Sequence, residues 1–323
     1  MNKKIYQSRE IIFRQGELGD SFFRVLRGSV MIILDYEQPD ALVLAMLEKG
    51  QFFGEMAVIE KYARSATAVA GPEGAEVEEI SCDETDGYLA GDPDLSIALM
   101  KHLGTRIADL TASYEDAVGL IREISEDPEI SGGSKYKERT KKHARKRRSG
   151  RKSVDAMVND KILLEKYGEH SKGYSKKVQE FPAGTVIVKE GMTGNCMYDI
   201  HWGRVGIYRG YGTDAELKIT ELYPNTFFGE MGLIRNEPRT ATAVALEDTT
   251  LEVILEEDLR ELFEKNPAKA GMIMAHLSNR LRKLTDQYED TCDLVCKVID
   301  AWDSNSPIST QLAAEIKEFA AKL

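Results

Sequence analysis

The sequence has few cysteines, four in 323 residues, which is too few for a disulfide framework in a chain of this length. We therefore expect a reducing, cytoplasmic location. No apolar run approaches the roughly 18 residues that a membrane-spanning helix needs. The N-terminus also lacks the apolar stretch and the small-residue cleavage site of a secretory signal. These absences predict a soluble protein with no membrane partner.

Motifs of catalysis are also missing. The chain has no P-loop, no nucleophile elbow and no His/Cys cluster with metal-ligand spacing. Cys292 and Cys296 lie one helical turn apart, but no His accompanies them, so we interpret them as packing residues. We expect a protein that is not an enzyme and that holds no metal and no cofactor.

Charge is distributed unevenly along the chain. Apolar residues make up 42% and charged residues 30%, which is ordinary for globular domains, and the length predicts about two of them. The net charge is −11, but residues 135–152 hold eleven Lys or Arg and one Glu, a local +10, so the rest carries −21. A nucleic-acid partner would have to bind this basic segment, because the remainder repels phosphates.

The sequence contains one long internal repeat. FFGEM at 52–56 recurs at 227–231, and ATAVA at 66–70 recurs at 241–245, both with an offset of 175. Three glycines upstream keep this offset, and Leu-Thr and Tyr-Glu-Asp motifs downstream keep an offset of 174. A repeat of this length indicates a tandem duplication of one globular domain.

Each copy begins with short β-rich runs broken by Gly and ends in helical patterns. This order predicts a mainly β fold with flanking helices (α+β), with two β-roll or jelly-roll domains each followed by a long helix. We predict a first domain at 1–125, a basic linker at 126–152, a second domain at 153–302 that opens with a helix at 153–168, and a loop with a short amphipathic helix at 303–323.

The long helices, predicted at 95–124 and 268–302, carry apolar residues at heptad spacing. The first set is Leu103, Ile107, Leu110, Tyr114, Ala117, Ile121 and Ile124, and the second is Leu277, Leu281, Leu284, Tyr288, Thr291, Val295 and Val298. Two interpretations are open. Each helix lies on its own barrel, or the helices pair, either within the chain or with a second copy or another protein.

A 19-residue unit carries the chemistry. It reads FFGEMAVIEKYARSATAVA at 52–70 and FFGEMGLIRNEPRTATAVA at 227–245, and in each the Gly-Glu pair is followed nine residues later by Arg. A Gly lets the backbone approach a ligand closely. A helix that starts there would point free N–H groups at an anion. Arg can hold two phosphate oxygens at once, which Lys cannot.

These units resemble the phosphate-binding cassette of cyclic nucleotide-binding domains. That family includes protein kinase A regulatory subunits, cyclic-GMP-dependent kinases and the bacterial catabolite activator protein. The resemblance covers both copies, and it implies a non-enzymatic, allosteric sensor that signals through movement of its lid helices. It also implies that Glu55 and Glu230 accept the ribose 2′-hydroxyl, and that the N–H groups of Ala57 and Gly232 meet the phosphate.

The resemblance implies two ligand sites. The first comprises Phe53, Gly54, Glu55, Met56, Ala57, Arg64, Ser65, Ala66, Thr67 and Thr111. The second comprises Phe228, Gly229, Glu230, Met231, Gly232, Arg239, Thr240, Ala241, Thr242 and Thr285. We expect cyclic AMP or cyclic GMP as the ligand, with cyclic AMP slightly favoured, and a pyrimidine cyclic nucleotide stays open.

The basic linker leaves alternatives. It is a solvated hinge, a nucleic-acid-binding segment of a DNA-associated regulator, or a pseudosubstrate of a kinase-regulatory inhibitor, because Ser149 and Ser153 follow basic residues. A scaffold with empty pockets is a further alternative. The bacterial relatives append a helix-turn-helix, whereas residues 310–323 predict one amphipathic helix, which cannot place a recognition helix in a groove.

Overall fold

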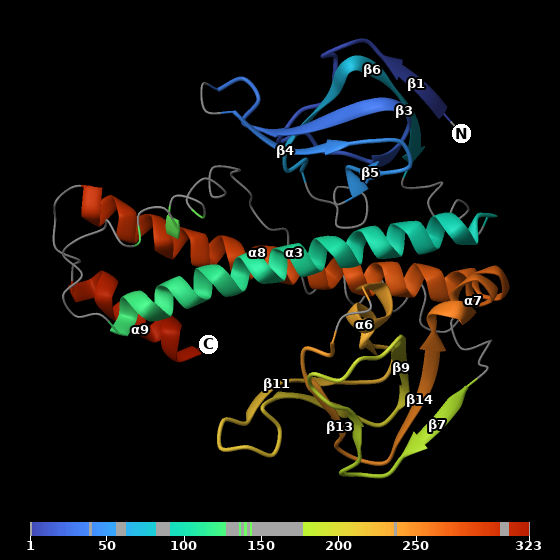
Figure 1. Ribbon diagram of the computed structural model, residues 1–323, viewed down its shortest axis with the longest axis vertical. Helices are drawn as coiled ribbons and strands as arrows, with labels where there is room; N and C mark the ends of the chain where they lie inside the picture. The colour runs from blue at the N-terminus through green and yellow to red at the C-terminus, as the bar shows by residue number, and fades with distance from the viewer. Residues whose placement is uncertain are drawn as a thin grey trace. The chain divides into compact units, whose positions relative to one another are not determined.

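The computed structural model describes residues 2–38, 41–55, 63–81, 91–126, 136, 139–140, 143, 177–235, 238–303 and 310–322. Strands dominate the early part of each copy and helices the late part (Figure 1). The predicted fold class, two antiparallel β domains with long helices, is confirmed.

The first copy forms one six-stranded antiparallel sheet. Its strands are β1 (Asn2–Tyr6), β2 (Ile11–Phe13), β3 (Ser21–Leu34), β4 (Leu42–Leu47), β5 (Phe52–Phe53) and β6 (Thr67–Ser81). The order is β1-β6-β3-β4, with β2 paired to β6 and β5 paired to β3. Phe23 on β3 stacks on Phe53 of β5 with ring centroids 5.1 Å apart, and this pair lies in the core of the copy.

The second copy forms two four-stranded antiparallel sheets, ordered β11-β10-β13-β8 and β12-β9-β14-β7. The strands are β7 (Val178–Phe181), β8 (Val186–Val188), β9 (Cys196–Trp202), β10 (Val205–Arg209), β11 (Leu217–Leu222), β12 (Phe227–Phe228), β13 (Thr242–Ala245) and β14 (Thr249–Leu255). Tyr198 stacks on Phe228 at 4.9 Å, which repeats the aromatic pair of the first copy at an offset of 175.

The helices follow the strands of each copy. They are α3 (Pro93–Glu126), α6 (Glu230–Arg235), the 3-10 helix η3 (Glu256–Asp258), α7 (Leu259–Lys265), α8 (Pro267–Asp303) and α9 (Thr310–Lys322). The long helices thus match the predicted ranges closely, whereas the helix predicted at 153–168 lies outside the described residues. Within the described part of the chain, no helix combines the length and the apolarity needed to cross a membrane.

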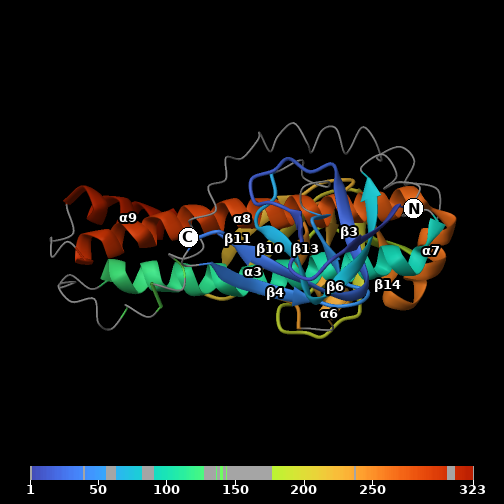
Figure 2. The ribbon, with the colours of Figure 1, turned by 90° about the horizontal axis from the view of Figure 1, so that it is seen from above.

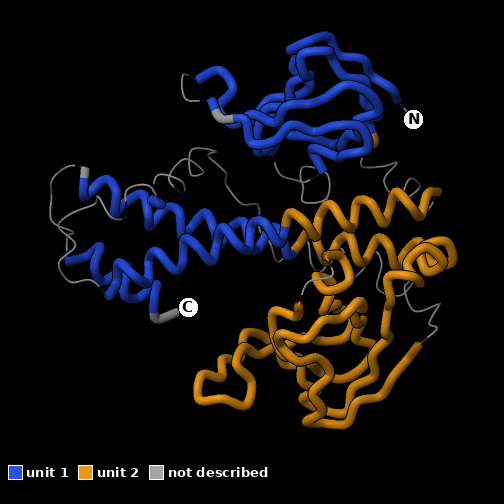
Figure 3. Tube along the Cα trace, viewed as in Figure 1, with its two compact units in different colours: residues 1–79, 107–154, 280–323 blue, residues 80–106, 155–279 orange. Residues whose placement is uncertain are grey.

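The chain divides into two compact units (Figure 3). One comprises residues 1–79, 107–154 and 280–323, and the other residues 80–106 and 155–279. The division falls inside α3 and α8, so each long helix contributes its early turns to one unit and its later turns to the other. The predicted domain boundaries follow the repeat, not this division, and they stay a prediction.

Later turns of α3 and α8 lie side by side, with α9 beside them (Figures 1 and 2). One shared cluster contains Leu120, Ile121, Ile124, Leu294, Val295, Val298 and Ile316. A second joins Ala117 of α3 to Tyr288 and Cys292 of α8. The apolar residues at heptad spacing left two interpretations open, and in these turns the helices pair with each other within the chain. The heptad pattern therefore encodes an intramolecular helix contact here.

The start of the basic segment packs on this helix pair. Tyr136 is buried and stacks on Trp302 of α8 at 6.1 Å. Arg139 donates to carboxylates of α3, Glu123 at 3.0 Å and Asp116 at 3.1 Å. His143 is buried, with Nδ1 2.8 Å from the hydroxyl of Tyr288. These three described residues of the segment therefore contact α3 and α8.

Candidate functional site

The cassette arginine of the first copy, Arg64, is buried and held by main-chain oxygens. Its Nη1 donates to the carbonyl of Gly54 at 2.7 Å and its Nη2 to the carbonyl of Ser21 at 2.6 Å. The backbone of Arg64 is fixed as well, because its N–H donates to Glu17 and its carbonyl accepts from Gly16. Carbonyl oxygens are neutral, so this arrangement fixes the guanidinium without neutralising its charge.

The second copy repeats the arrangement with equivalent residues. Nη1 of Arg239 donates to the carbonyl of Gly229 at 2.6 Å, and Nη2 donates to that of Cys196 at 2.7 Å. The N–H of Arg239 donates to Met192 and its carbonyl accepts from Gly191. Every partner lies 175 residues after its counterpart in the first copy. The duplication has therefore kept the hydrogen bonds of the arginine and not only its residue type.

In each copy one threonine hydrogen-bonds the loop that lies near the arginine. The hydroxyl of Thr67 accepts from the N–H of Gln15 at 3.1 Å, and that of Thr242 accepts from the N–H of Glu190 at 3.0 Å. Both threonines are buried on the strand that follows the arginine. Their hydroxyls thus act on the neighbouring loop of their own copy.

Glycines form a slot around each guanidinium. Gly54 and Gly229 have φ values of 76° and 77°, in the left-handed region that favours glycine. A Cβ on Gly19 would lie 2.3 Å from Cζ of the first arginine, and one on Gly194 would lie 2.6 Å from Nη2 of the second. A side chain at these positions would fill the space that the guanidinium occupies. The slot therefore requires glycine on two sides.

Aromatic rings surround the first arginine. The guanidinium carbon of Arg64 lies 4.2 Å from the ring centroid of Phe13 and 5.7 Å from that of Phe23, both within cation–π range. Burial lowers the pKa of Arg64, and the negative charges of Asp20 and Glu55 oppose this shift. The arginine stays charged, because an ordinary Arg pKa is above 12. The first slot thus presents a partly desolvated cation.

Polar side chains lie near the second arginine. Nη2 of Arg239 lies 3.3 Å from Sγ of Cys196. Burial, followed by the neighbouring thiol of Cys196, raises the pKa of Tyr198, so the phenol stays neutral. Val188 occupies the position that matches Phe13. The second slot therefore replaces an aromatic face with a thiol and a phenol.

The structure places the predicted site residues as follows. In the first copy Phe53, Glu55, Arg64, Ala66 and Thr67 are buried, Gly54 and Ser65 are half-buried, and Met56 and Ala57 lie outside the described residues. In the second copy Phe228, Glu230, Gly232, Arg239 and Thr242 are buried, Gly229, Met231 and Ala241 are half-buried, and Thr240 is exposed. The cassettes thus bring the motif glycines to the arginines, and the ligand roles of these residues stay predictions.

The lid threonines do not donate to the cassettes. The hydroxyl of Thr111 donates to the carbonyl of Ile107, and that of Thr285 to the carbonyl of Leu281, each at 2.8 Å on its own helix. Contact of either hydroxyl with a nucleotide base therefore stays a prediction.

Sequence reasoning missed the neighbours of the arginines. Phe13, Phe23, Cys196 and Tyr198 lie on strands far from the cassette in sequence, and Gly19 and Gly194 lie just before two of these strands. Gly19 and Gly194 recur at the constant offset of 175, and this recurrence is the sequence signal that could have predicted their role.

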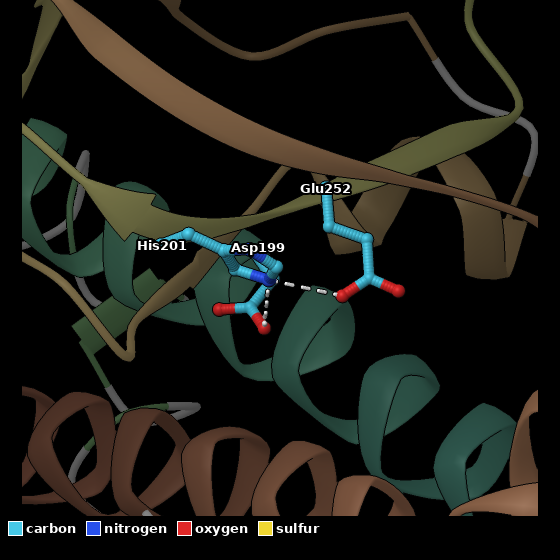
Figure 4. Close-up of side chains that lie close together, drawn as sticks. All are labelled: Asp199, His201 and Glu252. Carbon is cyan, nitrogen blue, oxygen red and sulfur yellow. Dashed lines mark hydrogen bonds and ion pairs between the residues drawn. The ribbon is translucent and has the colours of Figure 1, made fainter. Parts of the chain in front are cut away.

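A buried cluster of charges lies on the other face of β9 (Figure 4). Asp199 and His201 of β9 face Glu252 of β14, and the ring Nε2 of His201 lies 3.1 Å from a Glu252 oxygen. Lys269, in the first turn of α8, forms ion pairs with Asp199 and, at 3.0 Å, with Glu252. Hydrogen bonds to Asp199 and Glu252 raise the pKa of His201 to about 9, which burial opposes.

The three ligand-type residues of this cluster have the composition of a metal site, because their oxygen and nitrogen atoms lie within 4.8 Å of one another. The ammonium of Lys269 contacts both carboxylates, however, and two cations therefore balance two anions. Burial raises the pKa of Asp199, but hydrogen bonds and charges of His201 and Lys269 outweigh it and lower the pKa. We interpret the cluster as an ion-pair network that joins β9 and β14 to α8.

A model of the family described as "Cyclic nucleotide-binding domain" matches residues 3–84 and 178–266, which together exceed half of the chain. A cGMP-dependent protein kinase of Plasmodium berghei is 26% identical over 247 residues, 76% of this chain and 22% of that protein. A cyclic AMP receptor protein of Thermus thermophilus is 35% identical over 103 residues, 32% of this chain and 48% of that protein. The chain thus spans less than half the length of these relatives.

Among solved structures, the regulatory domain of Toxoplasma gondii PKA with cAMP is 15% identical, with a TM-score of 0.28, and the match covers 82% of each chain. The family model matches once in each copy and includes Gly54, Glu55 and Arg64 as well as Gly229, Glu230 and Arg239. The chain therefore belongs to the cyclic nucleotide-binding domain family and contains two such domains.

Proposed function

We propose that the protein is a non-enzymatic regulatory sensor whose two cassettes each bind one 3′,5′-cyclic nucleotide. The observation that carries this proposal is the pair of buried arginines, Arg64 and Arg239, held by equivalent main-chain oxygens in glycine slots. A fixed, buried guanidinium is suited to a single phosphate anion, because its charge-assisted hydrogen bonds are strong where water is excluded.

Glu55 and Glu230 are the proposed ribose ligands. Both are buried, 1% and 2% exposed, and each directly follows the glycine whose carbonyl accepts a hydrogen bond from the arginine. A carboxylate accepts hydrogen bonds from hydroxyls and repels phosphate, so it suits the 2′-hydroxyl and not the phosphate. This assignment predicts that 2′-deoxy cyclic nucleotides bind weakly.

Cyclic AMP is slightly favoured over cyclic GMP as the ligand. The relatives include a cyclic AMP receptor protein and a cGMP-dependent kinase, so they support the ligand class more than the base. We propose that binding moves the lid helices, whose paired turns around Ala117 and Tyr288 would pass the change on.

Calorimetric titration of the full chain with cyclic AMP, cyclic GMP, cyclic CMP and cyclic UMP tests the proposal. We expect two binding events, and Arg64→Ala or Arg239→Ala should each abolish one, with an affinity loss of about 100-fold or more, as for a buried charged hydrogen bond pair. Arg204→Ala is the matched control, because this arginine forms exposed ion pairs with Glu247 and Glu221. Absence of binding by the whole panel, or unchanged binding in the double arginine variant, would refute the proposal.

A further inference from the structure

The two arginines differ in the acceptors that their N–H donors already contact. A guanidinium has five N–H groups. Within the described residues, Nη1 and Nη2 of Arg64 donate to the carbonyls of Gly54 and Ser21. Nη1 of Arg239 donates to the carbonyl of Gly229, whereas its Nη2 contacts two acceptors, the carbonyl oxygen and Sγ of Cys196. The second arginine therefore has an additional acceptor, a thiol, beside the nitrogen that would meet a ligand.

Tyr198 lies on the same side of the strand as this thiol. Cys196 and Tyr198 are two residues apart on β9, so both side chains lie on the same face of the strand. The ring of Tyr198 is fixed by stacking on Phe228 with an interplanar angle of 15°. The thiol itself contacts the guanidinium of Arg239 at 3.3 Å.

The first copy has no such arrangement. Ser21 stands at the position of Cys196, and its hydroxyl donates to Glu79 at 3.3 Å, not to Arg64. Phe23 stands at the position of Tyr198 and has no hydroxyl to hold a partner. Arg64 instead lies over the ring of Phe13, which contacts the face of the guanidinium and leaves its edge donors available.

Building on the proposed function, we infer that the thiol of Cys196 occupies Nη2 of Arg239 and so determines which donors of this arginine meet the phosphate. A phosphate oxygen that approaches Nη2 in the second site must displace the thiol, whereas in the first site the same donor is available. The second site therefore binds its ligand less tightly than it would without the thiol. It also differs from the first site in its preference between the two exocyclic phosphate oxygens.

Phosphorothioate nucleotides report on this difference. Each diastereomer of a cyclic nucleoside phosphorothioate carries sulfur in place of one exocyclic oxygen, and sulfur accepts hydrogen bonds poorly. The ratio of the affinities of the two diastereomers therefore shows which oxygen the arginine binds. A general loss of protein stability would leave that ratio unchanged. Titrations in an Arg64→Ala background report the second site, and titrations in an Arg239→Ala background report the first.

The decisive variant is Cys196→Ala, which leaves the main-chain acceptor in place and removes the thiol. We expect the affinity of the second site to rise about fivefold, the equivalent of one hydrogen bond, and its diastereomer ratio to move toward that of the first site. Cys196→Val also removes the thiol and keeps an apolar side chain, so it should give the same diastereomer ratio as Cys196→Ala.

Cys292→Ala is the matched control, since this cysteine is buried on α8 in the cluster with Ala117. Thermal melts of each variant verify folding, and Cys196→Val gives a second reading if Cys196→Ala unfolds. A diastereomer ratio that stays at the wild-type value in Cys196→Ala, at any affinity, overturns the inference and leaves the proposed function intact. A wild-type chain that binds no cyclic nucleotide overturns both.

Discussion

The first and second copies hold their arginines through the same four backbone positions, but they support the surrounding structure by different chemistry. The first copy uses aromatic faces, Phe13 and Phe23, against its guanidinium. The second uses a thiol and a phenol there, and it joins its strands to α8 by buried ion pairs. The comparison shows that a duplicated domain preserves the contacts made by its backbone while the side chains around them diverge.

The ion-pair network is the clearest point of divergence. At matching offsets the first copy has Arg24 for Asp199 and Leu95 for Lys269, so it cannot form the same network. We predict that Lys269→Met destabilises the second copy by about 3–5 kcal/mol, because two buried carboxylates lose their cation. Leu95→Met, the matched change in the first copy, should cost less than about 1.5 kcal/mol.

Hydrogen exchange in β9 and β3 during urea unfolding would show in which copy each substitution lowers the free energy of unfolding. Equal effects of the two substitutions would contradict the difference that we draw between the copies.

The second prediction concerns pH. The pKa of His201 is about 9 in the folded chain, above its ordinary value near 6.5, because the protonated ring bonds Asp199 and Glu252. Its contribution is therefore complete below about pH 6.5 and is lost as the pH rises through about 9. We expect the free energy of unfolding of the second copy to fall by about 1–2 kcal/mol between these values, after allowance for screening of a half-buried ring.

Urea titrations at several pH values measure this effect. His201→Gln should flatten the profile, and Leu26, at the matching position of the first copy, contributes no titration. An unaltered pH profile in His201→Gln would exclude the histidine as its source.

The smallest expected effect is in the first slot. Phe13→Leu removes the ring face under Arg64 and keeps an apolar side chain, so it isolates the cation–π contact of 4.2 Å. We expect the first site to lose about 0.5–1 kcal/mol of binding free energy, or about two- to fivefold in affinity. Titration of the Arg239→Ala chain with the tighter cyclic nucleotide measures this change. Val188→Leu in the second copy is the control, and an equal loss there would assign the effect to packing.

Local motifs allowed much of this architecture to be predicted. The contiguous cassette located Gly54, Glu55 and Arg64, and the heptad spacing located the turns of α3 and α8 that pair around Ala117 and Tyr288. Both patterns are short in sequence and occur twice, so they can be recognised without knowledge of the fold.

Contacts between distant residues could not be predicted in this way. Cys196 lies 43 residues before Arg239, and strand alternation indicates which face a residue is on but not which side chain it meets. Lys269 lies 70 residues after Asp199, and a lysine in the first turn of a helix usually faces solvent. The strands β1 and β7 are largely exposed, so their sequences carry little apolar alternation.

The main-chain hold on the arginines has a consequence for mutational tolerance. Every amino acid supplies a carbonyl oxygen, so position 21 can be Ser and position 196 Cys while Arg64 and Arg239 keep the same acceptors. A substitution scan would leave these main-chain hydrogen bonds in place at both positions, although they fix the charge in place. Only a change in the backbone itself, such as an ester linkage after residue 21 that weakens the carbonyl as an acceptor, would reveal how much the cassette depends on them.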